Sequence, residues 1–327
     1  MQEWLYGPQG YYTTAKVGKA GDFYTSVSTS MFFGGTLGKH VVEQVRRGQL
    51  SPTAHVVEIG AHQGHMMADM IQFIYSLEPS LATSLHFTVI EPLASLRQLQ
   101  QQTFESAFGD ALHVKILPSL EALTCKEAVV VANELFDAFP CEVLTQEGML
   151  YLENHLPFFK TPSPEIAAKA QEFGVEKGEI ACGLEAFAQA LARACERCEF
   201  IGFDYGEAYA RNDISLRIYQ DHQSTPFFEL TCKAGSTERL VAFFAKADLT
   251  YDVNFAHVRQ AMEQAGFSLS ALQTQAKALV DFGLLELLEL LKVHAGEDAY
   301  RKELEKAKQL LLPTFLGERF KMIRMIK

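Results

Sequence analysis

Short apolar segments alternate with helix-like segments through the middle of the chain, and this alternation limits the fold more than any other feature of the sequence. Apolar residues recur at helical spacing over residues 66–77, and Pro79 ends that pattern. The strand-like segments are residues 55–59, 85–90, 113–117 and 128–132. Strands that are joined through helices form a parallel sheet, so we expect an α/β fold with a mostly parallel sheet. Residues 128–132 are apolar throughout, which predicts a central strand.

The second half of the chain adds a hairpin, further strands and a long helical stretch. Residues 142–144 and 149–152 flank a short turn and predict a hairpin. Residues 157–194 have the pattern of loop and helix. Residues 278–312 are helical and rich in leucine, and their apolar stripe indicates a core contact or a helical cover. The other predicted strands are residues 200–205, 216–219, 267–272 and 320–326.

The charge balance and the apolar runs limit the classes of partner. The 327 residues carry a formal net charge of −11. This argues against nucleic acid as a partner, because phosphate binding needs clustered Lys and Arg. A cationic substrate, such as a protein that bears arginine, would suit an acidic cleft. No 18-residue apolar run and no N-terminal signal pattern are present, so we expect a cytoplasmic protein without membrane insertion.

The cysteines and histidines do not indicate a metal. Cys195 and Cys198 form the close cysteine pair of the sequence, which we place at a helix end. A zinc site would need a second pair or a neighbouring His. His62 and His65 lack a carboxylate or cysteine at ligand spacing. We therefore expect reduced structural thiols and no metal.

The loop after the first predicted strand contains two glycines, Gly60 and Gly64. Ligands of an open α/β sheet bind outside the carboxyl ends of its strands. Gly60 can turn tightly there, and Gly64 can open a helix whose first N–H groups favour negative charge. Glu58 points toward the same loop, where a carboxylate could receive an amino group. Two glycines at this spacing are weak evidence, and an ordinary strand-to-helix turn is the alternative.

Polar side chains also follow the other predicted strands. Glu91 ends the second strand, where it can accept hydrogen bonds from both hydroxyls of a ribose. Residues 133–140 place an amide, two carboxylates and two aromatic rings after the central strand, which is costly unless the polar groups are solvated or used. Carboxylates there can hold a cationic nucleophile, and rings can flank a sulfonium or an adenine. The alternatives are a surface carboxylate for Glu91 and a helix cap for Asn133.

Six groups of short motifs follow one another in a specific order and spacing. They are G-Y-Y at 10–12 with G-D-F-Y-T-S at 21–26, E-I-G at 58–60 with Gly64, N-E-L-F-D-A-F-P at 133–140, D-Y-G at 204–206, D-L-T at 248–250 with Val253 and Phe255, and G-E-R-F at 317–320. Together they resemble the MidA-like family of S-adenosylmethionine-dependent methyltransferases, whose mitochondrial members act on an arginine of a respiratory complex I subunit. The resemblance covers almost the whole chain. It implies a class I methyltransferase fold, which is Rossmann-like, with helices on both faces of the sheet and helical additions.

The resemblance also implies S-adenosylmethionine as cofactor and assigns residues to it. The methionine end would lie against Glu58 and Gly60, and the ribose against Glu91. The implied cofactor-binding residues are Phe23, Thr25, Ser26, Glu58, Gly60, Gly64, Glu91 and Asn133. Glu134 is the implied catalytic residue, which would orient a guanidinium with support from Asp137.

The same resemblance divides the chain into three parts. Residues 1–50 would form an N-terminal segment and a lid over the cofactor, to which Phe23 belongs. Residues 51–275 would form the Rossmann-like core, with an inserted hairpin and helical region at about residues 141–195. Residues 276–327 would form a helical cover and the last strand.

The chain departs from the family's motifs at several positions near the implied site. Ala61 and His62 stand where the family has Pro and Gly. The imidazole could crowd the methionine end of the cofactor, although His adopts a positive φ more easily than most residues. Val27 and Ser28 replace a Pro and a Glu, and Asn254 replaces the last Asp of the fifth motif.

Two functions remain open. The first is an active methyltransferase that modifies a protein side chain, with an arginine nitrogen as the favoured acceptor, which needs mainly positioning of the reactants. The second is a binding or assembly protein with weak or absent turnover, in which His62 fills the loop and residues 278–312 hold a partner. An NAD-dependent enzyme would explain neither Glu58 nor residues 133–140.

Two further groups of residues have alternative interpretations. Asp204 and Tyr205, at the end of a predicted strand, either face the substrate or cap the next turn. The aromatic residues near the N-terminus indicate packing more than recognition; they are Trp4, Tyr6, Tyr11 and Tyr12.

Overall fold

The computed structural model describes residues 1–14, 25–220, 223–230 and 236–327, and the chain divides into two compact units. Unit 1 consists of Met1–Phe23, Phe136–Phe187 and Tyr205–Ala261, and unit 2 consists of Tyr24–Leu135, Ala188–Asp204 and Met262–Lys327. Each unit is therefore assembled from three separate stretches. Phe23 lies outside the described residues, and the lid and cover roles of residues 1–50 and 276–327 stay predictions.

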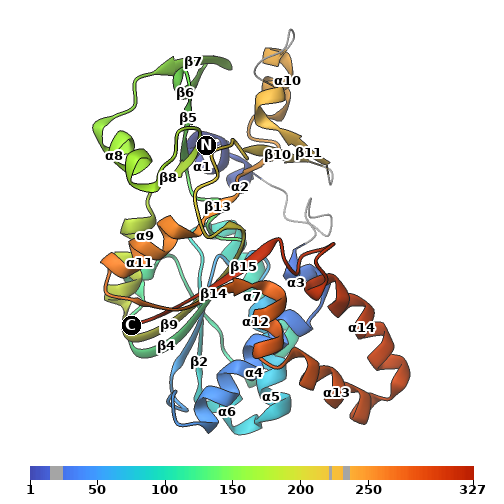
Figure 1. Ribbon diagram of the computed structural model, residues 1–327. Helices are drawn as coiled ribbons and strands as arrows, with labels where there is room; N and C mark the ends of the chain where they lie inside the picture. Colours follow the sequence, from blue (N-terminus) through green and yellow to red (C-terminus); the bar gives the residue numbers. More distant parts are fainter. Residues whose placement is uncertain (15–24, 221–222, 231–235) are drawn as a thin grey trace. The chain divides into compact units, whose positions relative to one another are not determined.

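Unit 2 contains the predicted parallel sheet. Its strands are β1 (His55–Ile59), β2 (His86–Ile90), β3 (Lys115–Leu117), β4 (Cys125–Asn133), β9 (Cys195–Glu207, which continues into unit 1), β14 (Ser268–Thr274) and β15 (Phe320–Ile326). They are ordered β14-β15-β9-β4-β1-β2-β3 (Figure 1). β1 pairs in parallel with β2 and β4, and β4 with β9, whereas β14 and β15 are antiparallel. The apolar segment predicted as central is β4, the middle strand of this order, so that prediction is confirmed.

The helices of unit 2 include the predicted helix at residues 66–77, which is α5, and the predicted helical stretch at residues 278–312. They are α3 (Ser26–Thr29), α4 (Phe32–Arg46), α5 (His65–Leu77), α6 (Pro79–Ser84), α7 (Ala94–Phe108), α12 (Gln275–Asp281), α13 (Leu284–Ala295) and α14 (Glu297–Leu311), with η1 (Gly109–Ala111) and η2 (Leu120–Ala122), while α9 (Leu184–Ala194) runs from unit 1 into unit 2. The helical stretch predicted for residues 278–312 is three helices. Gly283 and Gly296 interrupt it with φ values of 93° and 86°. Figure 1 shows α13 and α14 packed side by side.

Two glycines let α4 pack closely on α5. A Cβ atom at Gly34 would lie 2.8 Å from Cβ of Asp69, and one at Gly38 would lie 2.7 Å from the carbonyl oxygen of Met70. These contacts are shorter than a side chain allows, so α4 needs glycine at both positions. The close packing fixes α5, whose first turn begins directly after the loop that contains Gly64.

Unit 1 contains two antiparallel sheets and several short helices. Its elements are α1 (Gln2–Tyr6), α2 (Tyr11–Thr14), β5 (Cys141–Thr145), β6 (Gly148–Glu153), β7 (Leu156–Lys160), α8 (Pro164–Phe173), β8 (Gly178–Ala181), β10 (Arg217–Gln220), β11 (Gln223–Pro226), η3 (Phe227–Leu230), α10 (Ser236–Phe243), β12 (Asp248–Thr250), β13 (Val253–Asn254) and α11 (Phe255–Gln264, which ends in unit 2). One sheet has the order β7-β6-β5-β8 and the other β11-β10-β12. The predicted hairpin is confirmed as β5–β6.

The sequence analysis missed β7 and β8, because it described residues 157–194 as loop and helix. β7 contains Pro157, which cannot donate to a strand partner and is tolerated at an edge. β8 has only four residues, begins with Gly178 and pairs with β5, more than 30 residues earlier in the chain. Neither segment has the apolar alternation that identifies a strand locally, so tertiary pairing decides both.

The N-terminal aromatic residues pack inside unit 1, as predicted. Trp4 is buried, and its Nε1 donates to the carbonyl oxygen of Ala247 at 2.7 Å. The ring meets Phe227 and Phe244 edge to face, with centroids 6.1 and 5.2 Å apart. The hydroxyl of Tyr6 donates to the carbonyl oxygen of Ala138 at 2.8 Å. These bonds attach α1 to two other stretches of unit 1.

The cysteine pair lies on a strand and not at a helix end, which corrects the sequence analysis. α9 ends at Ala194, and β9 begins with Cys195. Cys125, the first residue of β4, is the register partner of Cys195, and their Sγ atoms are 3.2 Å apart. Cys198 is also buried, and all three are free thiols. The pairing of β4 with β9 brings Cys125 to this cluster from 70 residues away.

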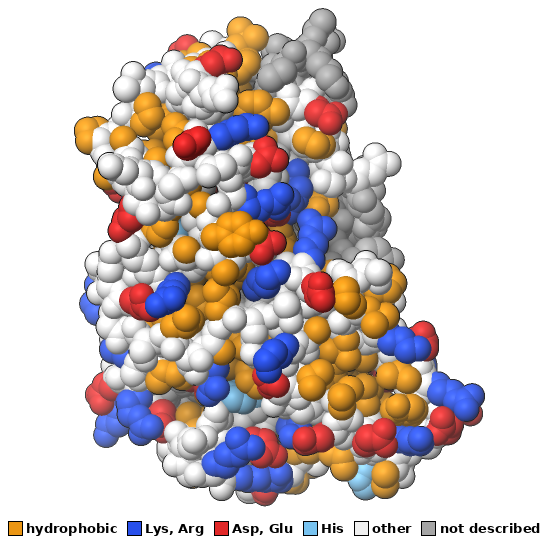
Figure 2. Space-filling view, viewed as in Figure 1, with side chains coloured by type: hydrophobic (Ala, Val, Ile, Leu, Met, Phe, Trp, Pro, Cys, Tyr) orange, Lys and Arg blue, Asp and Glu red, His pale blue; other side chains and the backbone are white. Residues whose placement is uncertain are grey.

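Hydrophobic side chains are exposed on and beside the last helices of unit 2. Figure 2 shows them gathered over α13 and α14. They are Val280, Leu285, Leu290, Val293, Leu312 and Phe315, each at least 41% exposed. Within the described residues, no helix is long and apolar enough to cross a membrane.

Candidate functional site

The loop between β1 and α5 has the backbone of a glycine-rich loop. Gly60 and Gly64 have φ values of 72° and 84°, and His62 between them has a φ of 45°. His62 thus adopts the left-handed conformation that glycine adopts most easily. Its imidazole is exposed. The N–H of Gly60 donates to the carbonyl oxygen of Ile90 at 3.1 Å, which attaches the loop to the end of β2.

The two glycines of the loop serve different needs. A Cβ atom at Gly64 would lie 2.8 Å from Cζ of Phe104 on α7, so this position is glycine because of internal packing as well as its positive φ. A Cβ atom at Gly60 would meet only Leu135 Cδ1, at 3.3 Å, among the described atoms within 4 Å. Gly60 is therefore the glycine beside which a ligand has room.

Glu58 is a buried carboxylate at the carboxyl end of β1. It is 3% exposed, and no donor in the described part of the chain reaches its Oε2 atom. Burial, together with the nearby carboxylates of Asp69 and Glu91, raises the pKa of Glu58 to about 8, although a backbone hydrogen bond from Met67 lowers it. Burial also raises the pKa of Asp69 on α5 to about 7. A cation at this place would relieve the cost of burying these carboxylates.

Glu91 follows β2 and is held at both carboxylate oxygens. It is 3% exposed, and burial raises its pKa. Its Oε1 accepts from the N–H of Leu93 at 2.9 Å, and its Oε2 accepts from Nε2 of Gln100 at 3.4 Å. Arg97 donates to the carbonyl oxygen of Glu91 at 2.9 Å. The carboxylate therefore has a fixed orientation, which suits recognition of a pair of hydroxyls.

Asn133 and Glu134 form a strained turn at the end of β4. Glu134 has a φ of 51°, which is uncommon for a residue other than glycine and costs about 1–3 kcal/mol. Nδ2 of Asn133 donates to Oε1 of Glu134 at 2.9 Å, and the N–H of Glu134 donates to the carbonyl oxygen of Phe203 at 2.9 Å. Oδ1 of Asn133 is buried and meets no donor within the described ranges. Strain of this kind is typical of functional sites.

The parallel register brings these residues to one edge of the sheet. Ile59 of β1 is the register partner of both Ile90 in β2 and Ala132 in β4. The residues that follow these positions are therefore neighbours at the carboxyl edge, where an open α/β sheet binds ligands. They include Gly60, Glu91, Asn133 and Glu134, with Glu58 one position before Ile59.

This edge fits S-adenosylmethionine. The group carries an amino group and a sulfonium, which are cationic, and a ribose with two hydroxyl donors. The edge offers buried carboxylates at Glu58 and Glu91, together with two acceptors that have no donor among the described residues, Glu58 Oε2 and Asn133 Oδ1. Buried acceptors are usually paired, so acceptors that have no donor in the described part of the chain favour a ligand that supplies one.

Thr25 and Ser26 have structural partners in unit 2. Thr25 caps α3 in a capping box with Ser28, the residue that replaces the family's Glu. Oγ of Ser26 is fully buried and donates to Oε1 of Gln275 at 2.8 Å. Their predicted contact with the cofactor stays a prediction, and Phe23 lies outside the described residues.

Asp137 belongs to unit 1, where its carboxylate is paired. It is 5% exposed and accepts a short hydrogen bond from the hydroxyl of Tyr205. Burial raises the pKa of Asp137 to about 6, although Tyr205 and Arg217 lower it. Arg217 also stacks on the Tyr205 ring, 4.8 Å from its centroid, and forms an ion pair with Asp252 at 2.6 Å. Tyr205 therefore faces Asp137, while Asp204 is fully buried in unit 2.

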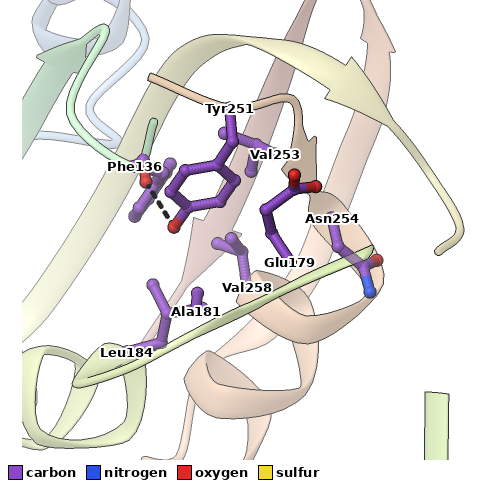
Figure 3. Close-up of a pocket in the computed structure, with 8 residues that line it drawn as sticks. All are labelled: Phe136, Glu179, Ala181, Leu184, Tyr251, Val253, Asn254 and Val258. Atoms are coloured by element: carbon purple, nitrogen blue, oxygen red, sulfur yellow. Dashed lines mark hydrogen bonds between the residues drawn. The ribbon is translucent and has the colours of Figure 1, made fainter. Parts of the chain in front are cut away.

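A small pocket is lined by residues of unit 1. Figure 3 shows Tyr251 at its centre, with its hydroxyl bonded to the carbonyl oxygen of Phe136 at 3.1 Å. The lining residues are Phe136, Glu179, Ala181, Leu184, Tyr251, Val253, Asn254 and Val258. Glu179 accepts hydrogen bonds from the backbone of Ser215 and Leu216, at 2.9 and 2.8 Å. The pocket contains none of the predicted cofactor residues that the structure describes, which all belong to unit 2.

The sequence analysis missed the residues of α5 and α7 that surround the loop. Gln100 is fully buried and donates to the carbonyl oxygen of His62 at 2.9 Å. Gln100 is one of four glutamines at positions 98 and 100–102. Gln100 lies four residues after Leu96 and four before Phe104, which are both buried, and this helical spacing was the sequence signal that Gln100 is buried too. Asp69 gave no signal, because its neighbourhood depends on the packing of α4 on α5.

In the described part of the chain, no group of three or more His, Cys, Asp and Glu side chains is placed to hold a metal.

The comparisons with known proteins identify the family of the chain. The sequence matches the family model described as "Putative S-adenosyl-L-methionine-dependent methyltransferase" over residues 36–273. Two curated relatives, from Mus musculus and Rattus norvegicus, are both named "Protein arginine methyltransferase NDUFAF7, mitochondrial". Each is 24% identical to this chain, over 98% of this chain and 78% of the relative.

The fold is shared with two solved structures from Burkholderia thailandensis. One is a "likely methyl transferase" bound to S-adenosyl-homocysteine, with a TM-score of 0.80 and 21% identity over 100% of this chain and 86% of that one. The other has a TM-score of 0.78 and 22% identity over 100% of this chain and 85% of that one. These similarities confirm the predicted Rossmann-like methyltransferase fold.

Proposed function

Because the chain belongs to this family of S-adenosyl-L-methionine-dependent methyltransferases, we propose that it methylates a protein side chain and that the acceptor is an arginine nitrogen. Two observations support this choice of acceptor. The curated relatives are named as protein arginine methyltransferases. The net charge of −11 favours the approach of a cationic protein segment.

The cofactor would be held by the carboxyl edge of the sheet in unit 2. When it is bound, S-adenosylmethionine supplies an electrophilic methyl group on a positively charged sulfur. Glu58, whose Oε2 atom has no donor in the part of the chain that the structure describes, would accept hydrogen bonds from the amino group. Glu91 would accept the ribose hydroxyls, and the backbone at Gly60 would lie beside the methionine end. Asn133 would accept a further donor at Oδ1.

The position of Glu134 carries the proposal. Its left-handed backbone sets its carboxylate at the end of the central strand, and Asn133 holds one oxygen at 2.9 Å. A carboxylate binds a guanidinium through two parallel hydrogen bonds, so it can orient one nitrogen as the nucleophile. The Glu134 carboxylate would also take the proton that this nitrogen loses on methylation. The supporting role of Asp137 stays a prediction, since its carboxylate already accepts from Tyr205.

The test combines transfer to protein with identification of the methylated residue. Radiolabelled S-adenosylmethionine is incubated with the enzyme and a protein extract, and the labelled proteins are hydrolysed to amino acids. We expect label in methylarginines, and a rate about 100-fold lower for Glu134→Gln with unchanged affinity for S-adenosylhomocysteine. Glu147→Gln, in the exposed turn between β5 and β6, is the control. Label in methyl-lysine alone, or an active Glu134→Gln variant, would contradict the proposed acceptor or the role of Glu134.

A binding or assembly role is the second candidate, and the exposed hydrophobic side chains over α13 and α14 favour it. The discriminating measurement is calorimetric titration with S-adenosylmethionine and S-adenosylhomocysteine, for the parent and for His62→Gly. The exposed imidazole of His62 leads us to expect binding by the parent. Binding that appears only in His62→Gly would mean that the loop is closed, and it would favour the assembly role.

A further inference from the structure

Gln100 on α7 connects the cofactor loop to the carboxylate of Glu91. We propose that Gln100 is a positioning residue that sets recognition of the ribose, because it fixes the orientation of Glu91 and the course of the loop at His62. The inference rests on the proposed cofactor site. It concerns a residue that none of the sequence motifs contains.

Two hydrogen bonds carry the inference. Nε2 of Gln100 donates to the carbonyl oxygen of His62 at 2.9 Å and lies 3.4 Å from Oε2 of Glu91. Gln100 is fully buried, on the same side of α7 as Phe104, whose ring fills the space beside Gly64. One side chain therefore touches both parts of the site, the loop after β1 and the acidic residue after β2.

The orientation of the amide follows from its neighbours. The carbonyl oxygen of His62 and the carboxylate of Glu91 are both acceptors, so only the NH₂ group of Gln100 can face them. Its Oε1 atom then points elsewhere, and it is buried without a donor in the described part of the chain. Leaving a buried oxygen unpaired is unfavourable. The two bonds from Nε2 are what a glutamine gains here over an apolar side chain of similar size.

The carboxylate of Glu91 shows why this bond affects the ribose. Its Oε1 is held by the N–H of Leu93 and its Oε2 by Gln100. Each oxygen keeps a further lone pair, so the two can accept two hydroxyls at once in one orientation. Without Gln100, the carboxylate keeps only the Leu93 bond and can turn about it. Both hydroxyls would then lose a prearranged acceptor.

The experiment compares two ligands that differ by one hydroxyl. S-adenosylhomocysteine and its 2′-deoxyribose analogue are titrated calorimetrically into the parent, Gln100→Met and Gln101→Met. Gln101 is the matched control, because it lies on the same helix and bonds to Glu105 instead of to the site. We expect the parent to prefer the ribose ligand by about tenfold or more, as for a hydrogen bond to a charged group. Gln100→Met should reduce this preference to about threefold or less, while Gln101→Met keeps it.

The preference between the ligands separates positioning from simple packing. If Gln100→Met weakens both ligands equally and keeps the preference, Gln100 only supports the fold and the inference is wrong. Gln100→Asn, whose amide is too short to span both acceptors, provides the same test if the Met variant does not fold. A parent that binds S-adenosylhomocysteine without any preference would overturn the inference alone. A parent that binds neither ligand would overturn the proposed cofactor site together with it.

Discussion

The loop of unit 2 and the Asp137 region of unit 1 both bury carboxylates after a strand, but they differ in how those carboxylates are paired. Oε2 of Glu58 has no donor in the described part of the chain, and burial raises the pKa of Glu58 to about 8. Asp137 accepts from Tyr205 near Arg217, and its pKa rises only to about 6. A buried acceptor whose partners lie in its own unit stabilises that unit, whereas one without partners is suited to a ligand. The presence of hydrogen-bond donors around a buried carboxylate, more than its burial or charge, thus distinguishes a structural role from a ligand-binding role.

The largest effect is expected for the paired carboxylate. Asp137→Ala would remove the carboxylate that accepts from the buried Tyr205 hydroxyl, and with it a negative charge near Arg217. We expect a loss of about 3 kcal/mol in the free energy of unfolding, measured by urea denaturation. Asp213→Ala is the control, because Asp213 is exposed and its ion pair with Lys177 contributes at most about 1 kcal/mol. An Asp137 variant as stable as the control would contradict the structural role of this region.

Glu58, whose Oε2 has no donor within the described residues, should affect binding and leave stability almost unchanged. Glu58→Gln keeps the size of the side chain, and near neutral pH it replaces a carboxyl group that burial keeps protonated with an amide that is also neutral but cannot ionise for a cationic ligand. We expect S-adenosylmethionine to bind about 10- to 100-fold more weakly, with an unfolding free energy equal to or above that of the parent. Calorimetry and urea denaturation measure the two quantities. A large loss of stability with unchanged affinity would show that Glu58 supports the fold and does not bind the cofactor.

The raised pKa of Glu58 predicts a pH dependence of opposite sign for folding and for cofactor binding. The folded, ligand-free protein holds a proton on Glu58 between its ordinary value of 4.5 and about 8, so the contribution of this group to stability falls as pH rises through that window. A cationic ligand favours the ionised form. Its affinity should therefore rise up to about tenfold per pH unit below pH 8, and binding should release a proton.

Calorimetry in buffers of different ionisation enthalpy measures the proton release. Glu58→Gln should remove most of it, and Asp69→Asn should remove a smaller part, because the pKa of Asp69 is raised to about 7. Equal heats in all buffers, with a constant affinity from pH 6 to 8, would show that Glu58 is already ionised or does not meet the cation.

The sequence predicted those parts of the fold that depend on local pattern. The apolar segments 55–59 and 128–132 became neighbouring strands, and their order placed the residues after them at one edge. β7 and β8 were missed because their pairing, and not their composition, makes them strands. The division into two units was also beyond local pattern, since unit 1 collects three distant stretches of the chain.

The candidate site was predictable at the strand ends and not between the elements. Glu58, Gly60, Glu91 and Glu134 each follow or end a recognisable strand, so their common edge could be inferred. Gln100 lies inside a helix among other glutamines, and its role depends on which face of α7 meets the loop. The left-handed backbone of Glu134 also depends on the turn that follows β4, which residue type alone does not fix.

The cysteine cluster at the beginning of β4 and β9 gives the smallest expected effect and extends the comparison to thiols. Cys125 and Cys195 are paired with each other, as Asp137 is with Tyr205. Although the bond with Cys125 lowers the pKa of the Cys195 thiol, the bond with Cys198 and burial raise it to about 12. The bond with Cys195 and burial raise the pKa of the Cys125 thiol further. Thiols held in the protonated form react slowly. We expect iodoacetamide to modify them at pH 8 only after denaturation, measured by mass spectrometry of peptides, and Cys125→Ala to leave cofactor affinity unchanged. Rapid modification in the folded protein would show that this pairing, unlike that of Asp137, does not protect the groups it joins.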